Sequence, residues 1–394
     1  MGARAKLHLV GDGGVLLDPL TQRIYRLNQA STLLWCCFLE GWSEDRVRAL
    51  LEKRCGLSPE RAEAYIASVL AEWSDLGLLD DGQLQGAAAE EGDALSPSRV
   101  DTAPPLAPMP PSTARRRVGY WVLDSAIELR GLPEPLADAM DEALGHLVST
   151  RLGEAPVICT LVETSHGYEL TEGNRVIDRC SALDAVVPMV KAAIVRVAID
   201  RATAFAIVHA AAVCGDGSAV VLPGPAGSGK STLAASLMLE GWLLAADDIT
   251  ILDTDVLFQV RPLPTALCLK TDAWPVIAAK APEVTRLVVH RREDGQQVRY
   301  LRPLQDLAGK ETDPAFPIGL IAFPQYVDGA PLSVRRLNPG EAFDRFLPEF
   351  YPVSNRFESA TIDRLVGFLR QVPAIELYYG DGAAAAEAVR KWAR

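Results

Sequence analysis

Residues Gly224-Pro225-Ala226-Gly227-Ser228-Gly229-Lys230-Ser231 follow the pattern G-x-x-x-x-G-K-S. An apolar run, Ser218 to Leu222, precedes them, and Thr232 to Leu239 has the composition of a helix. Glycines let the backbone curl so that N–H groups point at phosphate oxygens, and the following helix adds the positive end of its dipole. The stretch is therefore predicted to be a phosphate-binding loop between a strand and a helix.

Each position of this loop has an expected role. Lys230 is long enough to reach the β- and γ-phosphates, and the Ser231 hydroxyl suits a Mg²⁺ ion. We therefore expect ATP and Mg²⁺ as cofactors, although the pattern also admits GTP. The predicted nucleotide-binding residues are Gly224, Pro225, Ala226, Gly227, Ser228, Gly229, Lys230, Ser231 and Thr232.

Composition narrows the class of protein. The chain has 394 residues, enough for two or three domains, and a formal net charge of −12. That charge argues against nucleic acid as a partner. The most apolar stretch, 183–214, is interrupted by charged residues, so no membrane span is expected. No secretory signal opens the sequence, and its seven cysteines form no C-x-x-C pair, which predicts a protein of the reducing cytoplasm.

The chain is predicted to have three parts. Residues 82–117 are rich in Ala, Pro, Gly and Ser and lack apolar periodicity, which predicts a flexible linker. Residues 1–81 form a compact unit before it, and residues 118–394 form the larger unit that carries the phosphate loop. Arg115, Arg116 and Arg117 end the linker and are expected to be solvated.

The N-terminal unit has the pattern of a small winged-helix-like α+β domain. Strand-like pieces at 7–10, 15–18 and 23–27 precede three helices, the first over about 29–39 and the others after Ser43 and Ser58. Such a unit binds either DNA or a peptide. Residues 1–81 contain nine Lys/Arg and twelve Asp/Glu, a net charge of −3, which disfavours DNA.

The residues that carry a resemblance in this unit are Gly13 to Asp18, Tyr25, Leu27-Asn28, Trp35, Gly41, and Trp73 to Leu79. In this order they resemble the PqqD family, small recognition elements for the leaders of ribosomally made precursor peptides. The resemblance implies that a precursor peptide is the partner, with its leader held by residues 1–81. The leader would add as an extra strand at the edge of the hairpin. A structural cap without a ligand is the alternative.

The larger unit contains many short strand signals, some of them linked as hairpins. This density predicts a mixed sheet instead of the purely parallel sheet of most phosphate-loop enzymes. One strand, Leu243 to Ala245, leads to Asp247 and Asp248, 17 and 18 residues after Lys230. Strand ends beside a phosphate loop face the ligand, so one carboxylate there can serve the metal and the other can accept a proton.

Three stretches together resemble the HPr kinase/phosphorylase family and its peptide-modifying relatives: His209 to Val213, the loop with Thr232, and Glu240 to Asp248. The fold class implied is α/β, a P-loop kinase with a mixed sheet. The resemblance implies that Asp247 is the general base for an acceptor serine, that Asp248 lies beside metal and acceptor, and that His209 lies near the phosphates. It also implies a homo-oligomer. By itself, a histidine among apolar residues is more often a packed core residue.

Departures from the HPr-specific enzymes bear on the substrate. Thr232 stands where those enzymes typically have Glu, and no copy of their later signature segment is found. HPr as substrate and phosphorolysis are therefore not expected to carry over. Weaker candidates for phosphate contact are Lys270, Arg291, Arg292, Arg299 and Arg302, with solvated surface charge as the alternative.

The function expected from the sequence is a fused peptide kinase. It would transfer the γ-phosphoryl group of ATP to a Ser or Thr hydroxyl of a precursor peptide. Lys230, Asp247 and His209 would be the catalytic residues, and Ser231 and Asp248 the metal ligands. Two other interpretations stay open at this point: a nucleotide-gated peptide-binding module without phosphoryl transfer, and a kinase of an HPr-like carrier.

Overall fold

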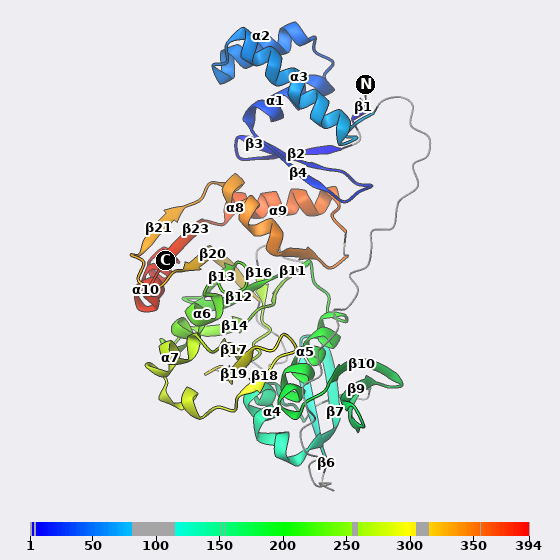
Figure 1. Ribbon diagram of the computed structural model, residues 1–394, viewed down its shortest axis with the longest axis vertical. Helices are drawn as coiled ribbons and strands as arrows, with labels where there is room; N and C mark the ends of the chain where they lie inside the picture. The colour runs from blue at the N-terminus through cyan, green and yellow to red at the C-terminus, as the bar shows by residue number, and fades with distance from the viewer. Residues whose placement is uncertain are drawn as a thin grey trace. The chain divides into compact units, whose positions relative to one another are not determined.

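The computed structural model describes residues 2–3, 5–80, 115–150, 152–153, 155–253, 259–304, 315–354 and 356–393. The chain divides into two compact units, each built of strands and helices (Figure 1). The N-terminal unit consists of residues 1–107 together with 354–370, and the second unit of residues 108–353 and 371–394. The expected mixture of α and β structure with mixed sheets is confirmed.

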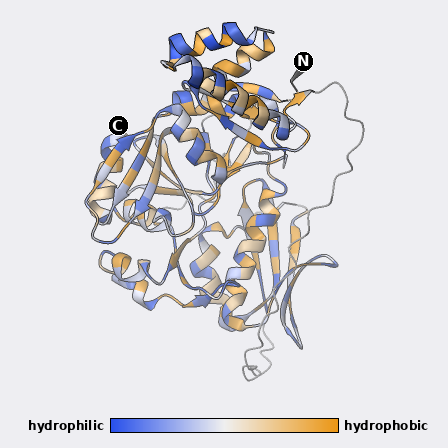
Figure 2. Ribbon diagram, turned by 45° about the horizontal axis from the view of Figure 1, so that its top comes forward, coloured by the Kyte–Doolittle hydropathy of each residue, from blue (hydrophilic) through white to orange (hydrophobic). Residues whose placement is uncertain are grey.

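The N-terminal unit follows the predicted order of strands and helices. Its antiparallel sheet has the strand order β2-β3-β4, and β1 pairs with β5. The strands are β1 (Gly2–Ala3), β2 (Lys6–Val10), β3 (Gly13–Leu17), β4 (Ile24–Leu27) and β5 (Leu79–Asp80). The helices are α1 (Gln29–Leu39), α2 (Glu44–Cys55) and α3 (Pro59–Asp75). The helices carry both hydrophobic and hydrophilic residues (Figure 2).

Two tryptophans form the centre of this unit. Trp35 of α1 and Trp73 of α3 pack edge to face with ring centroids 4.8 Å apart, and both are buried. The Asn28 side chain caps α1 by accepting the Ser31 N–H at 2.8 Å. Ser43 precedes α2 as expected, but its side chain makes no capping hydrogen bond. Glu44 and Asp45 in the first turn of α2 place negative charge at the positive end of the helix dipole.

Helix α9 (Ser359–Gln371) belongs largely to the N-terminal unit, although it follows the phosphate loop by more than a hundred residues. Asp363 accepts a 2.6 Å hydrogen bond from the buried ring of His8, and its other oxygen lies 3.7 Å from Lys6. Arg370 donates to the Leu9 carbonyl at 3.3 Å. Residues 118–394 therefore do not pack as one block, because α9 is held to strand β2.

The second unit begins with a five-stranded sheet of order β10-β9-β8-β7-β6, in which β7 and β8 are parallel and the other pairs antiparallel. Helices α4 (Ala137–Leu144) and α5 (Val186–Ile199) pack on this sheet through a large apolar cluster. The strands are β6 (Arg115–Val122), β7 (Ser125–Pro133), β8 (Val157–Thr164), β9 (Gly167–Glu172) and β10 (Arg175–Cys180).

The expected linker lies mostly outside the described residues. Its last residues, Arg115 to Arg117, are exposed as expected, but they begin strand β6 and pair with β7 instead of ending a linker. Arg116 also forms a two-pronged contact with Glu134. Helix α4 ends at Leu144, and one 3₁₀ turn, Gly145–Leu147, follows it.

A mixed sheet of ten described strands holds the phosphate loop. The order is β14-β12-β13-β20-β16-β15-β11-β22, and β23 and β21 continue from β20. Strand β13 (Ser218–Pro223) is antiparallel to β12 (Ala210–Gly215) and parallel to β20 (Phe316–Tyr326). The others are β11 (Ala206–Val208), β14 (Leu243–Ala246), β15 (Thr250–Leu252), β16 (Gln259–Arg261), β21 (Ser333–Arg336), β22 (Phe350–Pro352) and β23 (Ala374–Tyr379).

A three-stranded sheet of order β17-β19-β18 and four helices complete the unit. Helix α6 (Lys230–Leu239) and helix α10 (Gly382–Trp392) share an apolar cluster with strands β12, β13, β20 and β23. The remaining elements are α7 (Ala273–Ala278), α8 (Pro339–Phe346), β17 (Leu267–Lys270), β18 (His290–Arg291) and β19 (Gln297–Leu301). This cluster fixes α6 against the strand from which the loop emerges.

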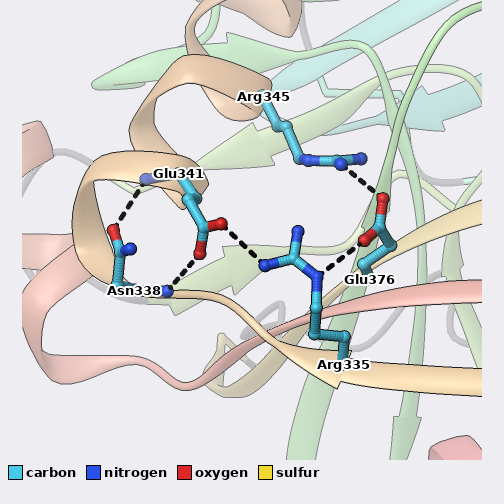
Figure 3. Close-up of polar contacts among 5 residues, drawn as sticks. All are labelled: Arg335, Asn338, Glu341, Arg345 and Glu376. Atoms are coloured by element: carbon cyan, nitrogen blue, oxygen red, sulfur yellow. Dashed lines mark hydrogen bonds and ion pairs between the residues drawn. The ribbon is translucent and has the colours of Figure 1, made fainter.

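An ion-pair network ties α8 to the strands beside it (Figure 3). Asn338 and Glu341 form a capping box at the start of α8. Arg335 of β21 bridges Glu341, at 2.6 Å, and Glu376 of β23, at 3.0 Å, while the other Glu376 oxygen accepts from Arg345. The network therefore connects one helix with two strands.

Two further properties concern the whole of the described chain. All seven cysteines are free thiols. Among the helices that the structure describes, none has the length and apolar composition needed to cross a bilayer.

Candidate functional site

The phosphate-loop sequence forms the turn between β13 and α6 as predicted. Gly227 and Gly229 have φ values of 84° and 96°, a backbone region that residues with a side chain rarely adopt. A Cβ at Gly229 would lie 2.5 Å from Tyr379 Oη, and the same hydroxyl donates to the Gly229 carbonyl at 3.4 Å. Tyr326 N–H donates to the Ser228 carbonyl at 3.0 Å. Two tyrosines outside the loop therefore hold its backbone through hydrogen bonds to Ser228 and Gly229.

The loop's own polar groups fit a phosphate chain. Lys230 is buried, and its ammonium donates to the Gly224 carbonyl at 2.5 Å and to the Pro225 carbonyl at 3.0 Å. The Ser228 hydroxyl is buried and has no hydrogen-bond partner in the described part of the chain. The first N–H groups of α6 have no intrahelical acceptors. An anion in the loop would supply acceptors to all of these donors.

The two acids lie in a turn directly after strand β14. Ile249 N–H donates to the Asp247 carbonyl at 2.8 Å, which closes a three-residue turn around Asp248, whose φ is 63°. A strand would have pointed the two carboxylates to opposite faces. The turn removes that restriction.

Asp247 is bonded to the phosphate-loop helix. The Ser231 hydroxyl donates to Asp247 Oδ1 at 2.8 Å, and the Cys268 N–H donates to Oδ2 at 2.7 Å. Burial first, and the charge of Asp248 second, raise the pKa of Asp247 to about 6. A carboxyl with such a pKa accepts a proton near neutral pH more readily than an ordinary aspartate.

Nearby carboxylates also affect the pKa of Lys230, the lysine of the phosphate loop. Burial lowers the pKa of Lys230, and the charges of Asp248, Glu349 and Asp247 oppose that effect in this order. The structure therefore brings Lys230, Ser231, Asp247 and Asp248 together, as the spacing predicted. The metal ligands were expected to be Ser231 and Asp248, and the hydrogen bond from the Ser231 hydroxyl adds an Asp247 oxygen to those beside Ser231.

His209 lies at the break between two strands of the sheet. It separates β11 from β12, because β11 pairs with β15 and β22 whereas β12 pairs with β13 and β14. The His209 N–H donates to the Glu349 carbonyl at 2.7 Å. Its ring Nδ1 lies 2.7 Å from Glu349 Oε2, and about a third of the histidine side chain is exposed. His209 is therefore a partly exposed imidazole, oriented by Glu349, and not a core residue.

The five weaker candidates divide into separate groups. Lys270 ends β17 and its charge acts on Lys230. Arg291 lies 3.5 Å from Asp184, Arg302 lies 3.5 Å from Asp141, and Arg299 stacks on Trp274. Arg292 differs from these three because its Nη1 lies 3.9 Å from the Cys268 sulfur and its charge interacts with Asp248.

Sequence reasoning missed three side chains of this region: Glu349, Lys191 and Tyr300. Lys191 lies on α5, with its ammonium 5.2 Å from the centre of the Tyr300 ring, and its charge acts on Asp247. None of them belongs to a local motif, so only the folded chain brings Glu349 near Lys230, and Lys191 and Tyr300 near Asp247. Within the described residues, no group of three His, Cys, Asp or Glu side chains is placed to hold a metal ion.

One part of the chain matches a known protein family. Residues 13–79 match the family model described as Coenzyme PQQ synthesis protein D (PqqD). A search of curated proteins finds no match to the chain. The matched range starts in β3 and ends in β5, so it lies within the predicted unit of residues 1–81. Residues 13–79 therefore form a PqqD-like domain.

Proposed function

We propose that the protein is a P-loop kinase of the HPr-kinase-like type, dependent on ATP and Mg²⁺, that phosphorylates a Ser or Thr hydroxyl of a ribosomally synthesised precursor peptide. The observation that carries the proposal is the 2.8 Å contact between the Ser231 hydroxyl and Asp247. It links the phosphate loop directly to the acids at the end of β14, as phosphoryl transfer requires.

The chain's residues would divide the work as follows. The loop N–H groups and Lys230 would bind the β- and γ-phosphates. Ser231 and Asp248 would hold Mg²⁺, which supplies further neutralisation of phosphate charge. The acceptor oxygen would form a bond to the γ-phosphorus while the bond from that phosphorus to the β,γ-bridging oxygen breaks, and ADP would leave. Asp247 would take the hydroxyl proton.

His209 and Glu349 would act beside this centre. The Glu349 carboxylate fixes the imidazole by accepting at Nδ1, which leaves Nε2 for the transferring phosphoryl group or the acceptor. Most of the rate acceleration would come from position and electrostatics, since phosphoryl transfer needs little covalent participation by the protein.

The PqqD-like domain supports the choice of a precursor peptide as the substrate. Strand β4 pairs with β3 on one side only in the described sheet, so its other edge has backbone groups for an added strand. A leader held there would keep its core peptide at high local concentration for the kinase.

The deciding experiment is intact-mass spectrometry of candidate precursor peptides after incubation with the protein, ATP and Mg²⁺. A gain of phosphate that disappears with Lys230→Ala and with Asp247→Asn is the expected result. Nucleotide-dependent peptide binding without any mass gain would instead favour the binding-module function.

A further inference from the structure

The two carboxylate oxygens of Asp247 accept hydrogen bonds from two different elements, α6 and β17. Oδ1 accepts from Ser231 on the phosphate-loop helix, and Oδ2 accepts from the Cys268 N–H on β17. Cys268 is paired across the sheet with Tyr300 of β19. In the proposed function, the nucleotide binds on the α6 side of Asp247. The side formed by β17 and β19 has no role in that function.

Two cations lie on this second side. Lys191 reaches it from α5, with its ammonium over the Tyr300 ring. Arg292 reaches it from the end of β18, where its Nη1 lies 3.9 Å from Cys268 Sγ. Both charges act on the Cys268 thiol, so the two cations lie around one point of the sheet.

Neither cation is neutralised by a close carboxylate of the site. The Lys191 ammonium lies over the Tyr300 ring, and no carboxylate of the described residues lies within 4.0 Å of it. Arg292 has an ion pair with Asp294 at 3.5 Å, but both side chains are more than a third exposed, and such pairs contribute little. The two charges are thus available to a ligand.

The balance of charge indicates which ligand fits. Asp247 and Asp248 interact with Lys230 towards the loop, and with Lys191 and Arg292 towards β17. Phosphates of a nucleotide would match Lys230. The pair of Lys191 and Arg292 includes a guanidinium, which suits carboxylate or phosphate, and would offset the repulsion between the two acids and an anionic acceptor.

We propose that Lys191 and Arg292 form an acceptor subsite that binds an anionic group, carboxylate or phosphate, carried by the peptide next to its reacting hydroxyl. This inference rests on the proposed function and names the class of acceptor that the same site prefers. The alternative is that the two cations only neutralise Asp247 and Asp248.

The test uses the full chain saturated with Mg²⁺ and the non-hydrolysable analogue AMP-PNP, into which inorganic phosphate is titrated by calorimetry. Lys191→Met and Arg292→Met should each weaken phosphate binding by about tenfold. Lys280→Met and Arg390→Met are the matched controls, because both residues pair with Glu240 elsewhere in the unit. The controls should bind phosphate as the wild type does. Unchanged AMP-PNP affinity in all variants would show that they fold.

Two results would overturn the subsite. One is a wild-type protein that binds no phosphate, or binds it no better than Lys191→Met and Arg292→Met. The other is phosphate binding that is lost with Lys230→Ala but kept with Lys191→Met, because that phosphate would lie in the loop. Failure of the proposed function has a different signature, since the protein would then not bind AMP-PNP through Lys230.

Short peptides distinguish the two sources of the anion. Asp-Ser-Gly and phosphoserine-Ser-Gly are used to displace the bound phosphate, with Asn-Ser-Gly as the neutral control. Displacement by the first peptide assigns a carboxylate, and displacement by the second alone assigns a phosphate. Equal displacement by all three peptides would contradict an anion-specific subsite.

Discussion

At the scale of single residues, Asp247 is costly to the fold. Its pKa of about 6 lies above that of an unfolded aspartate, about 3.9. The folded state therefore binds more protons between these values, and stability falls as the pH rises from about 4 to 6. Asp247→Asn removes the buried charge and can keep both hydrogen bonds. We expect phosphoryl transfer to be lost while the melting temperature at pH 8 stays equal or rises.

The measurement is thermal unfolding of both proteins at pH 5 and pH 8, alongside the transfer assay. The difference in melting temperature in favour of the Asn variant should be larger at pH 8 than at pH 5. A variant that is clearly less stable than the wild type at pH 8, or one that still transfers phosphate, would contradict the prediction.

A comparison of Gly229 with Gly241 separates the effect of the close contact with Tyr379 from the effect of the backbone conformation. Both have φ of 96°, but an added Cβ would meet Tyr379 at Gly229 and nothing within 4 Å at Gly241. Each alanine costs about 1 kcal/mol for the left-handed backbone. Gly229→Ala should lose at least about 1 kcal/mol more in the free energy of urea unfolding, because the loop must shift. Equal losses would mean that the tyrosine yields freely.

The residues predicted from sequence were those with a local pattern. Lys230, Ser231 and Asp247 belong to two short motifs, and the fold brings them together at the expected place. His209 was placed near the loop only by resemblance, and its partner Glu349 was missed, because 140 residues separate the two in the chain. Long-range pairs of this kind leave no periodic signal in one sequence.

At the scale of elements, Glu376 holds β21 and α8 to β23 through two arginines (Figure 3). The side chains of Arg335 and Arg345 are more than a third exposed, so the expected cost of Glu376→Gln is modest, about 0.5–1 kcal/mol in urea unfolding. The loss should shrink in 1 M NaCl, because salt screens the network. Glu387→Gln, on the exposed part of α10, is the control and should change little. A loss that does not depend on salt would point to packing instead.

A second pair connects the β6–β7 turn to β16. Arg261 donates to both Asp124 oxygens, and this bond lowers the pKa of Asp124. A lowered carboxyl pKa contributes stability that is present above the unfolded value and lost as the pH falls through the folded value. Asp124→Asn should therefore be less stable than the wild type at pH 7, by about 0.5 kcal/mol, and this difference should shrink as the pH falls below the unfolded value of about 3.9. Urea midpoints across this range decide it.

Helices and strands with a clear periodic pattern of apolar residues were predicted well. Strand ends that depend on which strands pair in the fold were not. Strands β2, β3 and β4 and helices α1 to α3 lie within a few residues of the predicted ranges. Residues 206–214 are apolar apart from His209, yet they form two strands, β11 and β12. The break at His209 arises from a change of strand partners, which alternation of side chains does not encode.

At the scale of the whole molecule, α9 changes how the N-terminal unit should be tested. His8 is buried and its ring bonds to Asp363, so deleting residues 1–81 would strip α9 of its partners. The truncated chain should lose stability as well as leader binding. A drop in activity after truncation would then have two causes, and the full chain is the better material.

The leader's role is best tested in trans with the intact protein. If the PqqD-like domain holds the leader, linkage raises the local concentration of the core peptide, and removing the leader should lower kcat/KM by about 10²-fold or more. The free leader should inhibit transfer to the full-length peptide competitively and should leave transfer to the leaderless core unchanged. A scrambled leader of the same composition is the control. If the free leader instead accelerated transfer to the leaderless core, the domain would act as a switch, because binding alone would then change the kinase site.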